Sequence, residues 1–137
     1  MIREASAEDQ ASVTALWSEC GLTKPWNDPA MDFNRALSFS SSTIFVAVDG
    51  HTVIGTSMTG FDGHRGWIYY LGVTPVRRGE GIARRLIEIC ADWLRQHECP
   101  KVELMLREGN PASGFYERLG WELQGVRVYA SRLRDAK

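Results

Sequence analysis

The chain has few cysteines, almost no net charge and no long apolar segment, and each shortage argues against a class of protein. Its three cysteines, Cys20, Cys90 and Cys99, show no paired spacing, which favours reduced thiols over a disulfide framework or a zinc finger. A formal net charge of -1 provides no basic field for nucleic acid. No apolar run reaches the length of a membrane span, and the first residues carry no signal-peptide core. We therefore expect a cytoplasmic protein whose partners include neither nucleic acid nor a membrane.

The composition is that of a soluble folded domain. Hydrophobic residues make up 44% of the chain and charged residues 24%. A length of 137 residues suits one domain with a substantial core, so we predict a single domain over residues 1–137. The three histidines, His51, His64 and His97, lie far apart with no cysteine at ligand spacing, and we expect no metal cofactor.

Turn signals and apolar periodicity predict alternating strands and helices. Ser6 can cap a first helix, Pro29 suits the first turn of a second, and Asp49-Gly50 is typical of a two-residue hairpin turn. The predicted strands are 2–5, 41–48, 51–59, 67–73, 101–107, 121–123 and 126–133, and the predicted helices are 7–20, 29–39, 81–97 and 112–119. This order indicates an α/β fold with a mixed, mostly antiparallel sheet of six or seven strands and four helices, including a parallel crossover around the long helix.

The segment 71–84 is the most informative part of the chain. An apolar strand leads into a turn rich in arginine and glycine, and a helix follows at once. Glycines allow a tight turn and close approach of a ligand, while the helix start presents unpaired N–H groups and the positive end of its dipole. Arg77, Arg78 and Arg84 can add positive charge. The pattern predicts a binding site for a diphosphate.

The residues alone leave three alternatives open for the glycine turn. A phosphate-binding loop of the NTPase type needs a Gly-Lys-Ser/Thr ending, which is missing. A dinucleotide fingerprint needs a third glycine where Arg84 stands, although Glu98 and Glu103 lie near the position of a ribose-binding acid. A glycine-rich turn without a ligand is the third alternative.

Two motifs resemble those of the GNAT family of N-acetyltransferases. Arg78-x-x-Gly81-x-Ala83, after a Leu-Gly-Val-x-Pro strand, resembles the acetyl-CoA motif of that family. Further along, Phe115-Tyr116-Glu117-Arg118-Leu119-Gly120-Trp121 resembles its second motif, whose usual form is Phe-Tyr-x-x-x-Gly-Phe. The order of predicted elements is also similar over nearly the whole chain. The resemblance implies the GNAT fold, with acetyl-CoA as co-substrate.

The resemblance also assigns residues to acetyl-CoA. Backbone N–H groups of residues 79–84 would hold its pyrophosphate, and backbone groups of residues 71–73 would pair with pantetheine where two strands splay apart. Gly72 would permit a local distortion of the strand or, alternatively, close packing. Asn110 lies six residues before Tyr116, whereas the family asparagine usually lies seven before its tyrosine. The predicted cofactor-binding residues are Leu71, Gly72, Val73, Arg78, Gly79, Glu80, Gly81, Ile82, Ala83, Arg84, Asn110 and Tyr116.

Acetyl transfer needs an acid for the leaving thiolate and a base for the amine. The resemblance makes Tyr116 the general acid, because a phenol can protonate the CoA sulfur; a packing tyrosine is the alternative. A backbone N–H of the splayed strand would stabilise the oxyanion. Glu103, Asp62 and His64 are candidates for the base, although Glu103 is equally well explained as a solvated residue on a strand face.

Two loops are candidates for the acceptor site. In the loop between the first two helices, Trp26 can form an acceptor wall and Asp28 can hold a cationic amine. In the loop before the cofactor strand, Asp62 and His64 can serve the amine and Arg65 can bind a substrate carboxylate. The alternatives are a loop-to-core anchor for Trp26, a helix cap for Asp28, and an exposed turn for His64 and Arg65.

These observations predict an acetyl-CoA-dependent N-acetyltransferase similar to small bacterial members of the family. The acetyl group would pass directly to a primary amine in a ternary complex, since neither Cys20 nor Cys90 looks like a nucleophile. A small molecule such as an amino acid is the favoured acceptor, and a protein amino terminus is the alternative. A non-catalytic acyl-CoA-binding module and a dinucleotide-binding module remain as competing functions, and a homodimer is left open.

Overall fold

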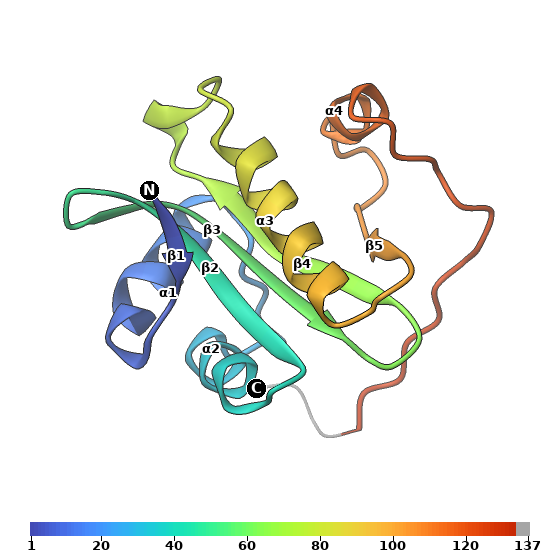
Figure 1. The fold of residues 1–137 in the computed structure, drawn as a ribbon, viewed down its shortest axis with the longest axis horizontal. Helices are drawn as coiled ribbons and strands as arrows, with labels where there is room; N and C mark the ends of the chain where they lie inside the picture. The colour runs from blue at the N-terminus through green and yellow to red at the C-terminus, as the bar shows by residue number, and fades with distance from the viewer. Residues whose placement is uncertain (134–137) are drawn as a thin grey trace. The chain divides into compact units, whose positions relative to one another are not determined.

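A five-stranded sheet runs in the spatial order β1-β2-β3-β4-β5 (Figure 1). The computed structural model describes residues 1–133. Two compact units make up the chain: one comprises Met1–Leu104 and contains the whole sheet, and the other begins at Met105. The strands are β1 (Ile2–Glu4), β2 (Ser42–Asp49), β3 (Thr52–Phe61), β4 (Gly66–Val73) and β5 (Val102–Leu104).

The strand pairing is antiparallel except at the β4–β5 edge, where it is parallel. The β2–β3 hairpin turns at Gly50, whose φ of 62° lies in the left-handed region that glycine adopts without a steric penalty. The predicted hairpin is therefore confirmed. Parallel pairing of β4 with β5 requires a crossover, and the chain makes it through the long helix α3.

Helices cover both faces of the sheet in the first unit (Figure 1). The 3-10 turn η1 (Ala7–Asp9) leads into α1 (Gln10–Glu19), and α2 (Pro29–Ser38) follows; both helices pack on one face. The second 3-10 turn η2 (Pro75–Arg77) precedes α3 (Ile82–Gln96), which packs on the other face. The second unit contains α4 (Ser113–Arg118). No helix within residues 1–133 is long and apolar enough to cross a membrane.

Two apolar layers hold these helices to the sheet. On one face, Trp17 of α1 and Phe33 of α2 are fully buried against Ile44 and Val46 of β2. On the other, Leu86 of α3 is fully buried. Burial of each large apolar side chain contributes about 1.5–3 kcal/mol. These layers fix α3 and α1 on opposite sides of the strands that carry the predicted site.

The sheet is smaller than the sequence predicts, although the α/β fold class and the four α-helices are confirmed. Residues 121–123 and 126–133 form no strand, and β5 is only three residues long. Leu123, Val128 and Tyr129 in this segment are 94%, 66% and 89% exposed. Apolar alternation alone does not make a strand, because a strand also needs a partner edge and a packed face.

An ion pair joins β1 to the start of α1. Two guanidinium nitrogens of Arg3 donate to the two carboxylate oxygens of Asp9 at 2.8 and 3.0 Å, and the Ser6 N–H donates to Asp9 at 2.8 Å. The Asp9 side chain is only 12% exposed. This bidentate geometry strengthens the pair relative to an ordinary surface contact.

We expect acid to weaken the fold through Asp9. The hydrogen bond from Arg3 lowers the pKa of this carboxyl from 3.8 to about 2. Because folding lowers the pKa, the stabilisation is complete above about pH 4 and is lost as the pH falls towards 2. In urea titrations, the free energy of unfolding of the wild type should drop by about 1–2 kcal/mol more than that of Asp9→Asn over this interval. The same pH dependence in both proteins would contradict the assignment.

Candidate active site

The glycine turn leaves the start of α3 open to a ligand. Gly79 and Gly81 have φ values of 84° and 80°, and an added Cβ at either position would meet no atom within 4 Å. Gly81 is the N-cap residue of α3, and no side chain caps this helix. The first backbone N–H groups of a helix lack partners within it. The turn is therefore shaped to accept an anionic group at the positive end of the helix dipole, as a diphosphate requires.

The three arginines around the turn differ in how much charge they can offer. Arg77 binds Glu80 at 3.0 Å and Asp49 at 2.7 Å, so its charge is already balanced, contrary to our expectation. Arg78 donates through Nε to the Val73 carbonyl at 3.0 Å. Among residues 1–133, Arg84 pairs with Glu88 at 3.3 Å along the exposed surface of the helix. Arg84 is the arginine best placed to swing towards a phosphate. The predicted role of Glu80 falls to its backbone, because its carboxylate binds Arg77.

The strand before the turn has an open edge. Pairing of β4 with β5 joins Gly66 to Val102 and ends with Ile68 opposite Leu104. Within the described residues, the part of β4 from Tyr69 to Val73 has no pairing partner on that side. Unpaired backbone groups of a strand readily bond an extended ligand. Leu71, Gly72 and Val73 all lie on this edge, where the family resemblance assigns pantetheine.

A bulge distorts β4 at the same place. Two residues, Tyr70 and Leu71, lie opposite Ser57, because the register shifts between Thr56 and Met58. Tyr70 has a φ of 51°, which costs a non-glycine residue about 1–2 kcal/mol. The predicted distortion therefore occurs at Tyr70 and not at Gly72. Gly72 instead allows close packing, since a Cβ there would lie 3.0 Å from Leu22 Cδ1 and 3.1 Å from Cys20 Sγ.

Two helices hold Tyr70 in this conformation. Its ring stacks on Trp17 of α1, with centroids 3.8 Å apart and planes inclined by 10°. Its hydroxyl donates to a carboxylate oxygen of Asp32 on α2 at 2.7 Å. Sequence analysis missed this pair. Asp32 resembles an ordinary acid in the first turn of a helix, and no local pattern links it to a residue 38 positions away.

The loop between β3 and β4 is a tight turn capped by Asp62. One Asp62 oxygen accepts hydrogen bonds from the backbone N–H groups of His64 and Arg65 at 2.8 and 2.7 Å. The other accepts from Trp67 Nε1 at 3.3 Å. These bonds lower the pKa of the exposed carboxyl. Asp62 thus has a structural function in the turn, and it stays ionised at neutral pH.

This turn lies at the far end of β4 from the glycine turn. Leu71 follows Gly66 by five positions along β4, a distance of roughly 17 Å along a strand. Glu103 also lies at this far end, opposite Trp67 in the register and 4.0 Å from Arg65. The structure therefore does not bring the predicted bases Asp62, His64 and Glu103 to the bulge.

The loop between α1 and α2 contains the residue that caps α2. Asp28 is the N-cap of α2 and accepts a hydrogen bond from the Met31 N–H at 3.2 Å. Asp28 therefore caps the helix, which was the alternative to an amine-binding role, and aspartate is a preferred residue at that position. Trp26 in the same loop is 42% exposed.

Tyr116 lies among aromatic side chains of the second unit. Its ring contacts Phe115 and Trp121 edge-on, with centroids 5.2 and 5.7 Å away. Burial raises the pKa of the Tyr116 hydroxyl, which therefore stays protonated at neutral pH, as an acid must. Asn110 belongs to the same unit, and its side-chain oxygen accepts a hydrogen bond from the Ala112 N–H at 2.8 Å. That bond occupies the oxygen of the amide.

The thiols of Cys20 and Cys90 are poor nucleophiles. Burial raises the pKa of Cys90 to about 12, and its sulfur lies 3.1 Å from Ser57 Oγ. Burial also raises the pKa of Cys20. A thiolate is the reactive form of cysteine, so neither side chain is suited to carry an acyl group. Within residues 1–133, no three or more His, Cys, Asp or Glu side chains form a potential metal site.

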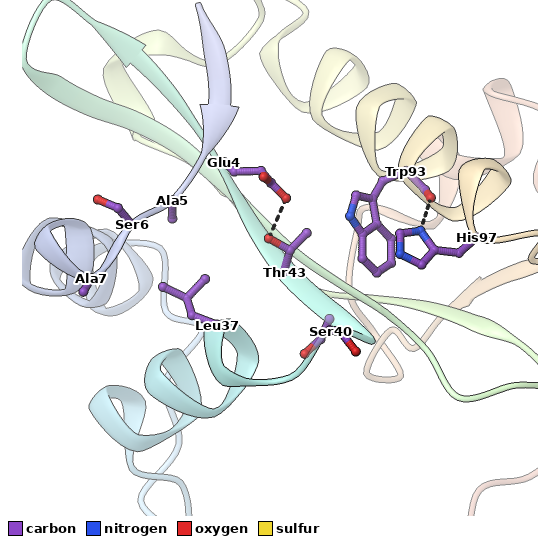
Figure 2. Close-up of a pocket in the computed structure, with 10 residues that line it drawn as sticks. Glu4, Ala5, Ser6, Ala7, Leu37, Ser40, Thr43, Trp93 and His97 are labelled. Atoms are coloured by element: carbon purple, nitrogen blue, oxygen red, sulfur yellow. Dashed lines mark hydrogen bonds between the residues drawn. The ribbon is translucent and has the colours of Figure 1, made fainter.

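A surface pocket of about 540 Å³ lies elsewhere in the first unit (Figure 2). Glu4 accepts a hydrogen bond from Thr43 on one side of it, and the Trp93 carbonyl accepts one from His97 Nδ1 on the other. The pocket adjoins the end of α3, whereas the glycine turn adjoins its start. The 15 residues of α3 span about 22 Å, so this pocket is separate from the candidate active site.

Comparison with known proteins identifies the family. The sequence model of the acetyltransferase (GNAT) family matches residues 10–121. The chain belongs to the GNAT family. A relative from Yersinia pestis (strain Pestoides F), named acetyltransferase, is 43% identical to this acetyltransferase over 133 residues, which cover 96% of this chain and 94% of the relative. The protein is an acetyl-CoA-dependent N-acetyltransferase, as the two motifs predicted.

Solved structures show the same fold. A predicted acetyltransferase from Clostridium acetobutylicum, crystallised with acetyl-CoA, has a TM-score of 0.79 at 17% identity, covering 96% of this chain and 95% of that one. The aminoglycoside 6′-N-acetyltransferase of Acinetobacter haemolyticus has a TM-score of 0.81 at 20% identity, covering 98% and 99%. Acetyl-CoA is the co-substrate of this acetyltransferase because the chain belongs to the GNAT family.

We expect Gly81→Ala to weaken acetyl-CoA binding. An alanine is strained at a φ of 80°, so the turn must shift the N–H groups of α3 away from the pyrophosphate. Calorimetry should show the Kd for acetyl-CoA rising roughly tenfold or more. Gly63→Ala is the matched control, because Gly63 has a φ of 93° and open space around it but lies in the distant β3–β4 turn. Equal weakening by both substitutions, or by neither, would contradict the assignment of the turn.

Proposed function

We propose that this protein acetylates a primary amine of a small molecule by direct attack of the amine on acetyl-CoA in a ternary complex. The observation that carries the proposal is the open edge of β4, which leads from the Tyr70 bulge straight into the glycine turn. A ligand held by its diphosphate at residues 79–84 can extend along this edge. Its acyl end then meets distorted backbone beside two helices.

The chain supplies the groups that such a transfer requires. Backbone N–H groups on the open edge near the bulge can stabilise negative charge on the thioester oxygen. Tyr116 donates a proton to the leaving thiolate, and its raised pKa keeps that proton available at neutral pH. The raised pKa values of Cys20 and Cys90 favour direct transfer over a covalent acyl-enzyme.

The surface that runs along β4 from the β3–β4 turn towards the bulge supports a cationic acceptor. The rings of Trp67 and Tyr69 lie nearly parallel with centroids 6.3 Å apart, and Tyr69 is 40% exposed. Neutral N–H groups hold the Asp62 carboxylate next to Trp67, so its negative charge persists. Aromatic faces and a carboxylate together attract an ammonium group. In this proposal Asp62 contributes charge, while His64 and Arg65 border the entrance.

Three further parts of the proposal concern the whole molecule. Residues 1–137 act as one N-acetyltransferase domain, a view supported by the match of the family model to residues 10–121. The protein works in the cytoplasm, consistent with its three free cysteines. A homodimer is compatible with this activity.

A screen of CoA release tests the proposed reaction. The purified protein with acetyl-CoA should release free thiol with some members of a panel of amino acids, diamines, aminoglycosides and peptides. A preference for cationic small amines would support the proposal. Turnover with peptides alone would favour a protein amino terminus as acceptor, and acetyl-CoA binding without any turnover would indicate a non-catalytic module.

We expect Tyr116→Phe to reduce turnover and spare acetyl-CoA binding. The substitution removes the proton donor but keeps the ring that contacts Phe115 and Trp121. With the best acceptor from the screen, kcat should fall about 100-fold, while the Kd for acetyl-CoA stays unchanged. Tyr129→Phe, at an 89% exposed tyrosine of the same unit, provides the control and should have no effect. Unchanged turnover in Tyr116→Phe would exclude Tyr116 as the acid.

A further inference from the structure

The proposed reaction lacks a base near the bulge if only the residues predicted from the sequence are considered. Asp62, His64 and Glu103 lie at the other end of β4. A different carboxylate lies beside the bulge. We propose that Asp32 accepts the proton of the acceptor amine through the hydroxyl of Tyr70. This assignment rests on the proposed acetyl transfer to an amine.

The contact between Asp32 and Tyr70 is short and well oriented. Tyr70 Oη donates to Asp32 Oδ2 at 2.7 Å, a typical length for a hydrogen bond to a charged oxygen. The ring cannot swing freely, because Trp17 lies flat against it at 3.8 Å. The backbone is also fixed in a left-handed conformation at the bulge. Strained residues that their surroundings hold in place cluster at active sites.

Two buried polar atoms without hydrogen-bond partners lie close to the same bulge. Trp17 Nε1 and Thr56 Oγ1 are buried and have no hydrogen-bond partner among the described residues. Trp17 contacts Tyr70, and Thr56 pairs with Gly72 next to the bulge. Buried polar atoms without partners are rare in folded proteins and often mark functional sites. Two such atoms lie beside one distorted residue. This arrangement suits a site that handles polar groups as well as one that packs apolar side chains.

The proton transfer balances with these two side chains. One amine N–H bond breaks and its proton goes to Tyr70 Oη, while the Tyr70 proton passes to Asp32 Oδ2. Tyr70 ends unchanged and Asp32 ends neutral. Burial and the nearby Asp32 raise the pKa of Tyr70, so the tyrosine does not act as a phenolate and requires the carboxylate as final acceptor. The thiolate receives a separate proton from Tyr116. After product release Tyr116 regains a proton from solvent and Asp32 loses its proton to solvent, which restores both groups.

Few other charges face this pair. Arg35 on α2 lies 3.3 Å from Asp32 Oδ1. From β4 the facing titratable group is Tyr70 itself, and α1 presents the uncharged Trp17. Asp28, one turn earlier on α2, accepts the Asp32 N–H through its backbone carbonyl.

Asp32→Asn separates proton transfer from a structural role. The asparagine oxygen can still accept the Tyr70 hydroxyl, so the link between α2 and β4 and the melting temperature should persist. With an acceptor identified in the screen, kcat should fall about 100-fold or more, with unchanged Kd for acetyl-CoA. The acidic limb of the pH–rate profile should disappear. Asp92→Asn is the matched control, because Asp92 forms the same type of i,i+3 pair, with Arg95 at 2.7 Å, on α3. It should retain wild-type turnover.

Tyr70→Phe gives a second, independent readout. The substitution keeps the ring that stacks on Trp17 but removes the hydroxyl that bonds Asp32, so kcat should fall about 100-fold while the Kd for acetyl-CoA is retained. This split between kcat and Kd decides the question if Asp32→Asn fails to fold. A folded Asp32→Asn with wild-type kcat and pH profile would overturn the proposal and leave the pair as a structural link. An inactive wild type across the whole panel would instead refute the proposed function, and this inference with it.

Discussion

The hold of two helices on Tyr70 is the constraint on which the candidate site depends. Trp17 stacks on the ring of Tyr70 and Asp32 accepts a hydrogen bond from its hydroxyl, while the Tyr70 backbone is left-handed in the middle of β4. A regular strand would continue its pairing along β5. With the bulge, pairing on that side ends at Ile68, and the last part of β4 has no strand partner there among the described residues. Packing on the sheet face that α1 and α2 cover therefore supports the bulge, and the edge of β4 without a strand partner begins there.

The same packing logic sets the position of the glycine turn. Gly55 on β3 lets α3 come close, since a Cβ there would lie 3.1 Å from both Ile82 and Leu86. The helix start is thereby fixed against the sheet, and the turn from β4 enters it through the left-handed Gly81. Glycine serves two different purposes in this region, close contact at Gly55 and backbone conformation at Gly81. Both bring the helix dipole to the end of the open strand edge.

Local features of the site could be predicted from the sequence, whereas its tertiary pairs could not. The glycine turn, the β2–β3 hairpin and the helix capped at Asp28 depend on neighbouring residues, and their patterns are legible. The Tyr70–Asp32 bond joins β4 to α2, and no periodicity reports it. The prediction for Asp62 failed because its carboxylate makes local contacts: it accepts hydrogen bonds from backbone N–H groups of its own turn. The alternation at 126–133 indicated a strand, but β pairing requires an edge that sequence alone does not reveal.

The proposed reaction uses separate groups as acid and base, which avoids direct proton transfer between the two. An acid and a base in direct contact neutralise each other, so a transfer enzyme gains from distinct tyrosines with distinct partners. Tyr116 has a raised pKa from burial and no carboxylate among its ring contacts, so it holds its proton until a stronger base appears. Tyr70 is bonded to Asp32 and can pass a proton on without keeping it. The two phenols thus differ in the groups that contact each hydroxyl. In the proposed reaction this difference, more than the residue type, sets which tyrosine gives a proton and which one relays it.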